Sequence, residues 1–486
     1  MPENLKNKLV RGATWSLVER FGYLSIQFIT NIVLARLLVP EDFGTMGVLL
    51  VFINLSLVLI DGGLANAIIQ KKFITEVDKS TVFYTNLILA IIIYAIIFIS
   101  SPRIAYFFRN QQLTELIRVL GLTIIIDAGS SIQNALIQKA VDFKSIARIK
   151  ITAALFSTMI AIATAMIGLG VWSLVIQHLM YSGIRFFLLW YRSVWLPKLE
   201  YSFESFKTLF NYGYKLLLST FLGELYYHSQ SFIIGRKFSS KDLGYYTQAK
   251  QLQYVPMTTI TNTINQVSFP VYSLIQDDKD RLQGLMKKNL KMAVFVNFPL
   301  MMYLSIEAKS IIILLYGDKW YFSIPYFQYL CLGYGLLSIV HQTNLTMFKA
   351  IGKSGVILKL EILKKILGIT FFFIGIMIWG IWGLMYALTL NSVIEIFING
   401  YYTKRFINYG ASSQLKDFTP TLLLSLVVTV CVYYVCNYLV YINNNLLNII
   451  VSAFLFCSLY LSFAGLFKFE SFMTILSIVR EKLHIR

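Results

Sequence analysis

The amino-acid sequence predicts an all-α polytopic membrane protein with about fourteen transmembrane helices. Three observations lead to this prediction: the apolar composition, a series of long apolar runs, and a biased distribution of Lys and Arg between the segments that join those runs. Of the 486 residues, 57% are hydrophobic and only 14% are charged. A soluble protein of this length needs far more charged surface, so the composition excludes the soluble classes.

The apolar runs are long enough to cross a bilayer. A membrane span needs roughly 20 mostly apolar residues, and runs of this length are spread evenly along the chain. Even spacing favours one integral membrane unit over several soluble domains. The expected helices span 13–35, 43–69, 81–100, 113–137, 148–168, 171–192, 212–235, 243–270, 290–306, 325–348, 357–378, 381–403, 419–441 and 446–467.

The basic residues indicate how these helices are oriented. If the N-terminal segment is cytoplasmic, about three quarters of the 43 Lys and Arg residues fall on the cytoplasmic side, as the positive-inside rule requires. We therefore expect a multi-pass protein of a bacterial cytoplasmic (inner) membrane with both termini in the cytoplasm. The net charge of +19 is then a topology signal and an anchor to anionic lipid, and a nucleic-acid partner is not expected.

The chain also resembles itself at a spacing of about 200 to 210 residues. Residues 35–44 align with 235–244, sharing Arg, Asp and Gly, and residues 170–174 align with 380–384, sharing Gly, Trp and Leu. The first twelve helices are therefore expected to be two copies of one six-helix unit. Because six is even, the copies are inserted in parallel, related by an axis along the membrane normal. Two such bundles would face a central cavity.

This repeat suggests four parts. We expect an N-terminal six-helix bundle at 1–192, an interfacial cytoplasmic linker at 193–211, a C-terminal six-helix bundle at 212–405, and two additional transmembrane helices with a cytoplasmic tail at 406–486.

The linker is expected to contain an amphipathic helix on the inner leaflet. Its apolar residues fall on one helical face, which is typical of a helix that lies in the membrane interface. These residues are Phe203, Phe206, Leu209 and Phe210. The C-terminal stretch 469–486 has a similar pattern.

Three motifs in the first 80 residues resemble those of a known family. Residues 12–16 (GATWS), 34–44 (LARLLVPEDFG) and 61–64 (DGGL) are similar to the N-terminal half of bacterial Wzx-type oligosaccharide flippases, members of the multidrug/oligosaccharidyl-lipid/polysaccharide exporter superfamily. The helix count and the repeat extend the resemblance over nearly the whole chain.

The resemblance implies a transporter that is not an enzyme. Such a flippase moves undecaprenyl-diphosphate-linked oligosaccharide units from the inner to the outer leaflet by alternating access, for assembly of a surface polysaccharide such as lipopolysaccharide or exopolysaccharide. Its partners would be the lipid-linked oligosaccharide, membrane lipids and other polysaccharide-assembly proteins.

Three other readings stay open. A cation-coupled multidrug exporter of the same superfamily would need an acidic cavity. A membrane polysaccharide polymerase or glycosyltransferase would usually carry a long outer loop, whereas the outer segments here are short. A scaffold of a sugar-assembly complex would not need a pseudo-symmetric bundle with polar residues inside.

Polar residues inside the spans are the candidate substrate contacts, because such groups are costly in lipid and usually face a cavity or a partner. Arg20 lies roughly 13 Å into the first helix, at about 1.5 Å per residue from Arg11. Its guanidinium suits a diphosphate, although a structural ion pair would explain it equally well. Further candidates for the diphosphate or the sugar, which could also snorkel or bond between helices, are Arg118, Lys250, Gln251, Gln253, Tyr254 and Asn265.

Acidic residues in the spans are candidates for ion coupling. Glu224 and His228 are four residues apart on one helical face, so they could relay a proton or simply share an internal hydrogen bond. His178 and His341 are expected to pack or to bond within the protein. The remaining candidates are Asp61, which also suits a helix-ending turn before two glycines, with Asp127 and Glu395.

No cofactor or metal is expected. The four cysteines show no metal-ligand spacing. The triplet Gly352-Lys353-Ser354 resembles part of a phosphate-binding loop, but Met347 occupies the position of the required glycine. Without a nucleotide-binding domain, a cation gradient or the membrane potential is the expected energy source.

Overall fold

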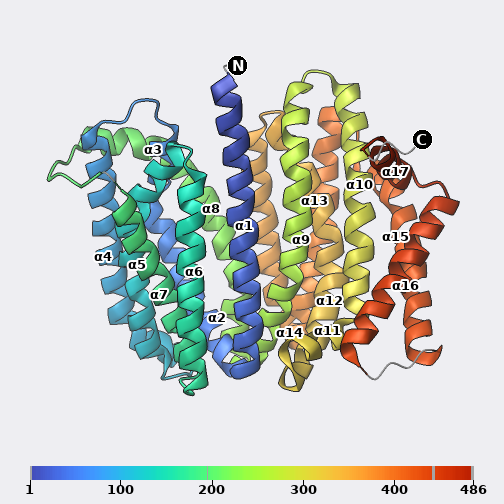
Figure 1. Ribbon diagram of the computed structural model, residues 1–486, viewed down its shortest axis with the longest axis horizontal. Coiled ribbons are helices and arrows are strands. Elements are labelled where there is room, and N and C mark those ends of the chain that lie inside the picture. The colour runs from blue at the N-terminus through green and yellow to red at the C-terminus, as the bar shows by residue number, and fades with distance from the viewer. Residues whose placement is uncertain (1–2, 194, 440–443, 483–486) are drawn as a thin grey trace. The chain divides into compact units, whose positions relative to one another are not determined.

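The computed structural model describes residues 3–193, 195–439 and 444–482, and every regular element in these ranges is helical. The chain divides into two compact units, Met1–Gly244 and Tyr245–Arg486, drawn in blue to green and in green to red in Figure 1. Within the described residues, eight helical segments are long and apolar enough to cross a membrane. Helices lie at all fourteen expected positions, so the predicted all-α polytopic membrane fold is confirmed. The expected helix 43–69 is divided into two at Gly62 and Gly63, which both have left-handed backbone conformations. The last two residues of the expected helix 419–441 lie outside the described residues.

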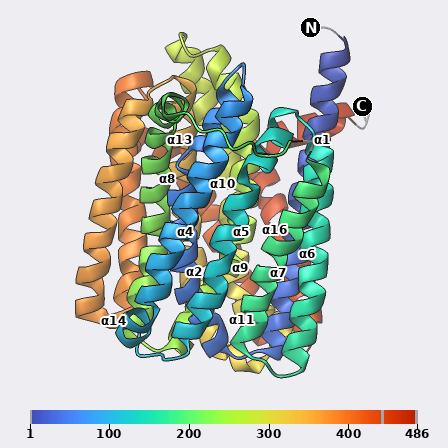
Figure 2. The same cartoon turned by 90° about the vertical axis from the view of Figure 1, so that its left-hand side faces the viewer.

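The N-terminal unit is a bundle of long helices. In it α1 packs on α6, α6 on α7, α4 and α7 on α5, and α2 on α5 and α8; Figure 2 shows α4, α5, α6 and α7 side by side. Its helices are α1 (Glu3–Leu37), α2 (Pro40–Asp61), α3 (Leu64–Gln70), α4 (Glu76–Phe107), α5 (Leu113–Lys139), α6 (Phe143–Met166), α7 (Val171–Arg192) and α8 (Phe203–Lys237).

Local side-chain chemistry sets the helix ends. Thr75 and Asp78 form a capping box at the start of α4, in which each side chain accepts a hydrogen bond from the other's backbone N–H. Asp142 caps α6 by accepting a hydrogen bond from the backbone N–H of Ser145 at 3.1 Å. Gly62, in the left-handed conformation, ends α2.

A close crossing joins the first turns of α2 and α9 (Ser240–Leu274). A methyl group on Gly44 would lie 1.7 Å from the carbonyl oxygen of Ser240, and one on Gly244 would lie 1.8 Å from that of Pro40. Only glycine fits at either position. Since these residues belong to the two aligned motifs, 35–44 and 235–244, each copy of the motif makes the same contact with the other.

The C-terminal unit is also helical. In it α13 packs on α14 and α10, α15 packs on α10 and α16, and α17 packs on α10 and α16. Its elements after α9 are α10 (Lys279–Ile306), α11 (Ala308–Tyr316), the 3-10 helix η1 (Asp318–Ser323), α12 (Ile324–Leu330), the π-helix η2 (Cys331–Gly335), α13 (Leu336–Ala350), α14 (Ser354–Ile407), α15 (Ala411–Tyr434), the π-helix η3 (Val435–Leu439), α16 (Asn445–Leu466) and α17 (Glu470–Lys482).

The long element α14 is a helical hairpin. Its helical dihedrals are interrupted at Trp379 and Gly380, where Gly380 has φ 60° and ψ −139°. We call residues 355–378 the first arm and 381–407 the second arm. The arms touch where Gly375 faces Gly383, since a methyl group on Gly383 would lie 1.8 Å from the carbonyl oxygen of Gly375. The predicted break between 378 and 381 is confirmed.

The linker region differs from expectation. Residues 203–211 were predicted to form a separate interfacial helix, but they are the first turns of α8 and continue without interruption. Leu209 is buried, and Phe206 packs beside it in a cluster that also includes Trp195 and Phe83. Core packing therefore extends α8 at its start, while Phe203 stays exposed.

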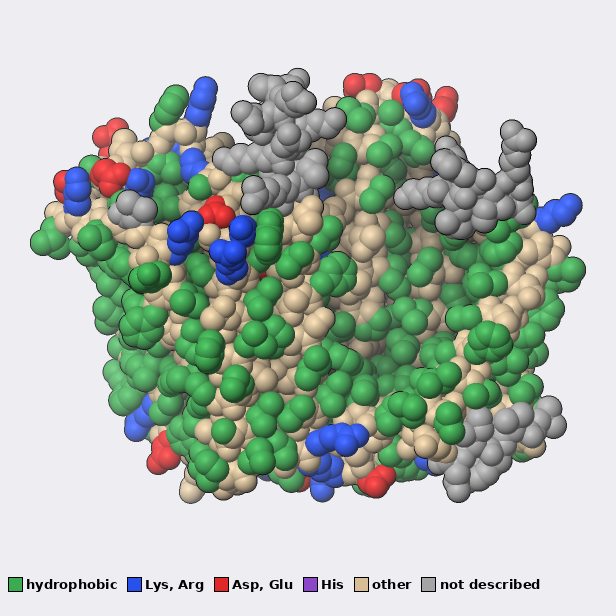
Figure 3. Space-filling model, viewed as in Figure 1, with side chains coloured by type: hydrophobic (Ala, Val, Ile, Leu, Met, Phe, Trp, Pro, Cys, Tyr) green, Lys and Arg blue, Asp and Glu red, His purple; other side chains and the backbone are tan. Residues whose placement is uncertain are grey.

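The helix surfaces suit a lipid environment. On the face shown in Figure 3, hydrophobic side chains cover the middle of the helices, and charged side chains gather towards the helix ends. On α4 alone, large apolar side chains are exposed at Ile88, Ile92, Ile96 and Ile99. Exposed apolar area of this extent is typical of a lipid-facing surface.

Candidate functional site

Each unit holds a polar cluster among apolar helices. In the N-terminal unit this is a pocket of about 330 Å³ between α2, α3, α4, α5 and α7. We call it the N-unit pocket. Two carboxylates, one guanidinium, four amides and a hydroxyl provide its polar lining: Asp61, Asp127, Arg185, Asn66, Asn86, Asn134, Gln138 and Ser131.

Asp127 lies at the centre of this lining. Its Oδ2 accepts a hydrogen bond from Ser182 Oγ at 3.2 Å, and its Oδ1 lies 3.9 Å from Arg185 Nη1. Asn86, fully buried, donates to Ser131 Oγ at 2.8 Å. Asn86 Oδ1 and Asp127 Oδ1 are both buried and accept no hydrogen bond from a described residue. Buried oxygens without a hydrogen-bond donor are uncommon, so these two could accept hydrogen bonds from a bound ligand.

Asp61 reaches the same pocket from the end of α2. Its carboxylate accepts a hydrogen bond from the backbone of Ala65 in α3, so the residue does close the helix-ending turn that the sequence suggested. It also lines the N-unit pocket together with Asp127. The two positions predicted separately for ion coupling are therefore brought together.

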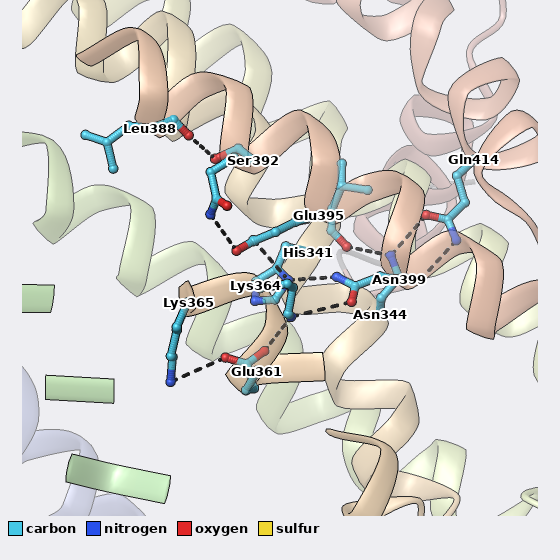
Figure 4. Close-up of polar contacts among 12 residues, drawn as sticks. His341, Asn344, Glu361, Lys364, Lys365, Leu388, Ser392, Glu395, Asn399 and Gln414 are labelled. Atoms are coloured by element: carbon cyan, nitrogen blue, oxygen red, sulfur yellow. Dashed lines mark hydrogen bonds and ion pairs between the residues drawn. The ribbon is translucent and has the colours of Figure 1, made fainter. Parts of the chain in front are cut away.

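The C-terminal unit contains a denser group, which Figure 4 shows. We call it the buried charge cluster. It joins α13 to both arms of α14, and its members are His341, Glu361, Lys364, Lys365, Glu395 and Asn399.

Lys364 is the most deeply buried charge in this cluster, with a side chain that is 2% exposed. Its ammonium group donates to Glu361 and lies 3.5 Å from Asn399 Oδ1 on the second arm. Lys365 is 3.6 Å from the other carboxylate oxygen of Glu361. The first arm thus brings two cations and one anion into the interior, where each must be paired to be tolerated.

His341 on α13 faces both arms. Its Nδ1 lies 2.8 Å from Asn399 Nδ2, 3.4 Å from Glu395 Oε2 and 3.5 Å from Lys364 Nζ. Glu395 also accepts a hydrogen bond from Asn391 at 3.0 Å. Glu395 was predicted as an ion-coupling residue, whereas His341 was expected only to pack or to bond within the protein.

A neutral amide network adjoins this cluster. Asn344, fully buried on α13, exchanges hydrogen bonds of 3.0 Å with Gln414 of α15 and accepts one from Thr403 at 2.6 Å. In the sequence repeat Asn344 corresponds to Asn134, which lines the N-unit pocket. The matching positions therefore have different surroundings, one bonded to neighbours and one facing a pocket.

The predicted diphosphate contacts have different surroundings. Arg20 is half-buried on α1 and makes no ion pair with another described residue, while its neighbour Glu19 pairs with Lys150 at 2.7 Å. Arg118 is held by α4: its Nε donates to Ser101 Oγ at 3.0 Å, and its guanidinium lies 4.4 Å from the centre of the Phe98 ring. Arg118 therefore has a structural role within the N-terminal unit.

The polar residues predicted on α9 differ in burial. Gln253 is buried and contacts Met257, whereas Gln251 is exposed and Tyr254 is 39% exposed. Lys250 is half-buried, 5.8 Å from the Tyr246 ring centre, and Asn265 is half-buried further along the helix. Lys250 and Tyr254, four residues apart, lie on one helical face, and the buried Gln253 differs from them in its surroundings.

The predicted Glu224 and His228 are neighbours in space on α8. Glu224 Oε2 lies 3.3 Å from His228 Nε2, which also lies 3.2 Å from Asn54 Nδ2 of α2. His228 is buried, and the side chain of Glu224 is 38% exposed. The arrangement of an Asn amide and a Glu carboxylate around one ring nitrogen resembles that at His341.

Sequence reasoning missed most residues of these clusters, and three cations are the clearest cases. Lys364 and Lys365 lie in the expected helix 357–378 and Arg185 in 171–192, but all three were counted only as topology signals of the cytoplasmic side. The structure pairs both lysines with Glu361 and places Arg185 in the lining of the N-unit pocket. The spacing of Glu361 and Lys364, three residues apart inside an apolar run, was the signal that could have identified a buried pair.

Comparison with known proteins then identifies the family. Residues 33–325, more than half of the chain, match the family described as polysaccharide biosynthesis proteins. The chain belongs to this family. The resemblance to Wzx-type proteins drawn from the sequence motifs is thereby confirmed.

Relatives of this polysaccharide biosynthesis protein cover most of its length. It is 27% identical to the lipopolysaccharide biosynthesis protein WzxC of Escherichia coli, over 82% of this chain and 81% of WzxC. It is 23% identical to the succinoglycan biosynthesis transport protein ExoT of Rhizobium meliloti, over 72% and 70%. Among solved structures, its fold is similar to that of the lipid II flippase MurJ, with a TM-score of 0.77 over 94% of this chain and 98% of that one, at 16% identity.

Proposed function

We propose that this protein is a flippase for lipid-linked oligosaccharides. It moves an undecaprenyl-diphosphate-linked sugar unit from the inner to the outer leaflet for surface polysaccharide assembly. The polyprenyl tail stays in lipid while the charged headgroup passes through the protein, which opens to one side of the membrane at a time.

The observation that carries this proposal is the relationship to WzxC over four-fifths of both chains. ExoT, which is named as a transport protein of polysaccharide biosynthesis, points to the same activity. The likeness to MurJ supplies a fold already used for a lipid-linked substrate.

The polar interior supports transport over a purely structural role. Charged groups inside a membrane bundle are costly and usually serve a pathway or a partner, and both units bury several of them. Arg20 is suited to hold the diphosphate, because a guanidinium binds phosphate oxygens in pairs.

The location follows from the charges at the helix ends. We place the protein in the bacterial cytoplasmic membrane, with the basic start of α1 (residues 6–11) and the basic segment after α16 on the cytoplasmic side, in keeping with the positive-inside rule. Other polysaccharide-assembly proteins would supply the substrate inside and consume it outside.

The two alternatives fit less well. An exporter of cationic drugs is expected to use an acidic cavity, but both polar clusters mix charges: Arg185 stands with Asp61 and Asp127, and two lysines stand with two glutamates. A polymerase would need a site that extends sugar chains, and among the described residues no group of His, Cys, Asp and Glu could hold a metal for such chemistry.

The proposal is tested in liposomes that contain the purified protein and a fluorescent polyprenyl-diphosphate oligosaccharide in both leaflets. An impermeant glycosidase added outside cleaves the outer-leaflet substrate at once and reaches the inner-leaflet substrate only if it is flipped. We expect complete cleavage with protein and incomplete cleavage in protein-free liposomes.

Each alternative predicts a different result in the same preparation. Longer sugar chains on a gel would indicate a polymerase, and uptake of a fluorescent organic cation without cleavage of inner substrate would indicate a drug exporter. Incomplete cleavage with folded protein across several sugar headgroups would refute the flippase.

A further inference from the structure

The surroundings of His341 differ from those of a histidine that only packs. A ring nitrogen in a stable internal hydrogen bond needs one partner, yet Nδ1 of His341 faces three polar atoms within 3.5 Å. Two of them, the amide nitrogen of Asn399 and the ammonium of Lys364, are donors. The third, Oε2 of Glu395, is an acceptor. A neutral ring with its proton on Nε2 accepts at Nδ1, and a doubly protonated ring donates from it, so both states have partners in place.

With a neutral ring the charges around His341 sum to zero, but they are unevenly placed. The charged groups that face it are Glu361, Lys364 and Lys365 on the first arm and Glu395 on the second arm. The two cations both lie at Glu361. On α10 and α15, which also belong to this unit, the charged side chains form a separate group, in which Lys287 and Lys291 lie 3.2 and 3.5 Å from Asp417.

The contact between Glu395 and His341 is consequently an ion pair only when the ring is protonated. Its side chain is 15% exposed, and among the described residues His341 is its only partner that could carry a positive charge within 4 Å. An isolated buried carboxylate is strongly disfavoured. A proton on either His341 or Glu395 removes this penalty, so the space between Nδ1 and Oε2 is a proton site.

From this geometry we propose that His341 and Glu395 together bind the proton whose movement drives transport. The inference rests on the flippase activity proposed above and names its coupling ion. Histidine changes charge near neutral pH more readily than any other side-chain type, which suits a site that must load on one side of a membrane and unload on the other.

Proton binding also changes how the two arms are tied together. In the neutral state the amide of Asn399 donates to His341 and its oxygen lies 3.5 Å from Lys364, which links the second arm to the first. A protonated ring can no longer accept from this amide and donates to Glu395 instead. The amide must then turn or withdraw, so the contact with Lys364 is weakened. One proton thus alters the link between α13 and both arms of the hairpin.

The test compares the steady-state distribution of substrate between leaflets with and without a pH gradient. If one proton moves per substrate, a gradient of one pH unit shifts the ratio between leaflets by up to about tenfold, because one unit corresponds to about 1.36 kcal/mol. The liposomes and the impermeant glycosidase are those described above, and the membrane potential is held at zero with valinomycin and equal potassium.

Two variants test the roles of His341 and Glu395 in this measurement, and a third is the control. His341→Gln keeps a hydrogen-bonding side chain that cannot be protonated, and Glu395→Gln removes the acceptor charge. His178→Gln makes the same chemical change on α7, in the other unit, and serves as the matched control. We expect the leaflet ratio to lose its response to the gradient in His341→Gln and Glu395→Gln, and to keep the wild-type response in His178→Gln.

The outcomes separate this inference from the proposed function. No flipping by the wild type refutes the flippase itself. If the wild type flips the substrate but its leaflet ratio does not respond to the pH gradient, the flippase proposal stands and the proton site is refuted. This conclusion does not depend on whether the variants fold. A wild-type response in a folded His341→Gln also overturns it, since the proton must then bind elsewhere.

Discussion

Gly380 has nearly the same backbone conformation as Gly170, which lies 210 residues earlier in the chain. Their φ and ψ angles are 60° and −139° for Gly380, and 55° and −131° for Gly170. Each glycine precedes a helix that begins with an aliphatic residue and a tryptophan. Asp42 and Asp242 likewise accept a hydrogen bond of 3.2 Å from the backbone of the residue three positions before them. The aligned motifs therefore share local backbone structure as well as amino-acid identities.

Gly380→Ala should destabilise the hairpin by roughly 1–3 kcal/mol, because side chains other than hydrogen are strained in this backbone region. Thermal unfolding of the purified protein in detergent measures the effect. Gly355→Ala in the same element is the control, since a methyl group there would meet no atom within 4 Å. Equal melting temperatures for the two variants would contradict the prediction.

Lys364→Met should destabilise the protein by about 3 kcal/mol, because it leaves Glu361 buried with only the more distant Lys365. The double variant Lys364→Met/Glu361→Leu removes both charges and should recover most of the loss. Chemical denaturation of the two variants and the wild type checks this. If the double variant is no more stable than the single one, the pair is not an isolated buried interaction.

Asp142, which lies at the start of α6 and outside the membrane spans, makes the stability of the folded protein depend on pH. Hydrogen bonds from Ser145 hold the pKa of the Asp142 carboxyl below its ordinary value, aided by Arg192 at 3.7 Å. A lowered pKa in the folded state means that the stabilisation is present above the unfolded value and is lost as pH falls through the folded value.

Asp142→Ala should therefore cost about 1 kcal/mol at neutral pH through the lost cap, and the difference from wild type should shrink below pH 4. Asp142→Asn, which also caps well, should cost less. Melting temperatures at pH 7 and pH 3 provide the measurement, and a pH-independent difference would show that the carboxylate charge does not contribute.

Arg20→Ala should slow flipping of a diphosphate-linked sugar about tenfold or more, the loss expected for a charge-assisted contact. Initial rates of glycosidase access in liposomes measure this. Arg103→Ala, which removes an exposed arginine of α4, should leave the rate unchanged. Similar rates for both variants would remove Arg20 from the substrate path and leave the flippase proposal in place.

Much of the fold could be predicted from sequence because membrane spans are set by length and apolarity. The break between 378 and 381 was placed correctly; in the sequence repeat Gly380 aligns with Gly170, which lies between two other expected helices. The start of α8 was not, because Phe206 and Leu209 fit a membrane interface as well as a protein core. Periodicity alone does not distinguish these two apolar environments.

The polar clusters were harder to predict. Asp61 and Asp127 were selected because carboxylates are rare in spans, but their meeting in one pocket depends on how α2 packs against α5. Lys364 was overlooked because a lysine near the end of an apolar run looks like the edge of a loop. Its burial depends on Asn399, which is 35 residues further along the chain, on the returning arm.

The hairpin form of α14 has a consequence for biosynthesis. As a lone segment, the first arm would expose Glu361, Lys364 and Lys365 to lipid, and each charge at mid-bilayer costs roughly 2.5–3.5 kcal/mol in translocon-mediated insertion. Only Trp379 and Gly380 separate it from the second arm, so the ribosome delivers Asn399 soon afterwards. The two arms therefore leave the translocon most favourably as a pair, with the charges of the first arm already facing the second.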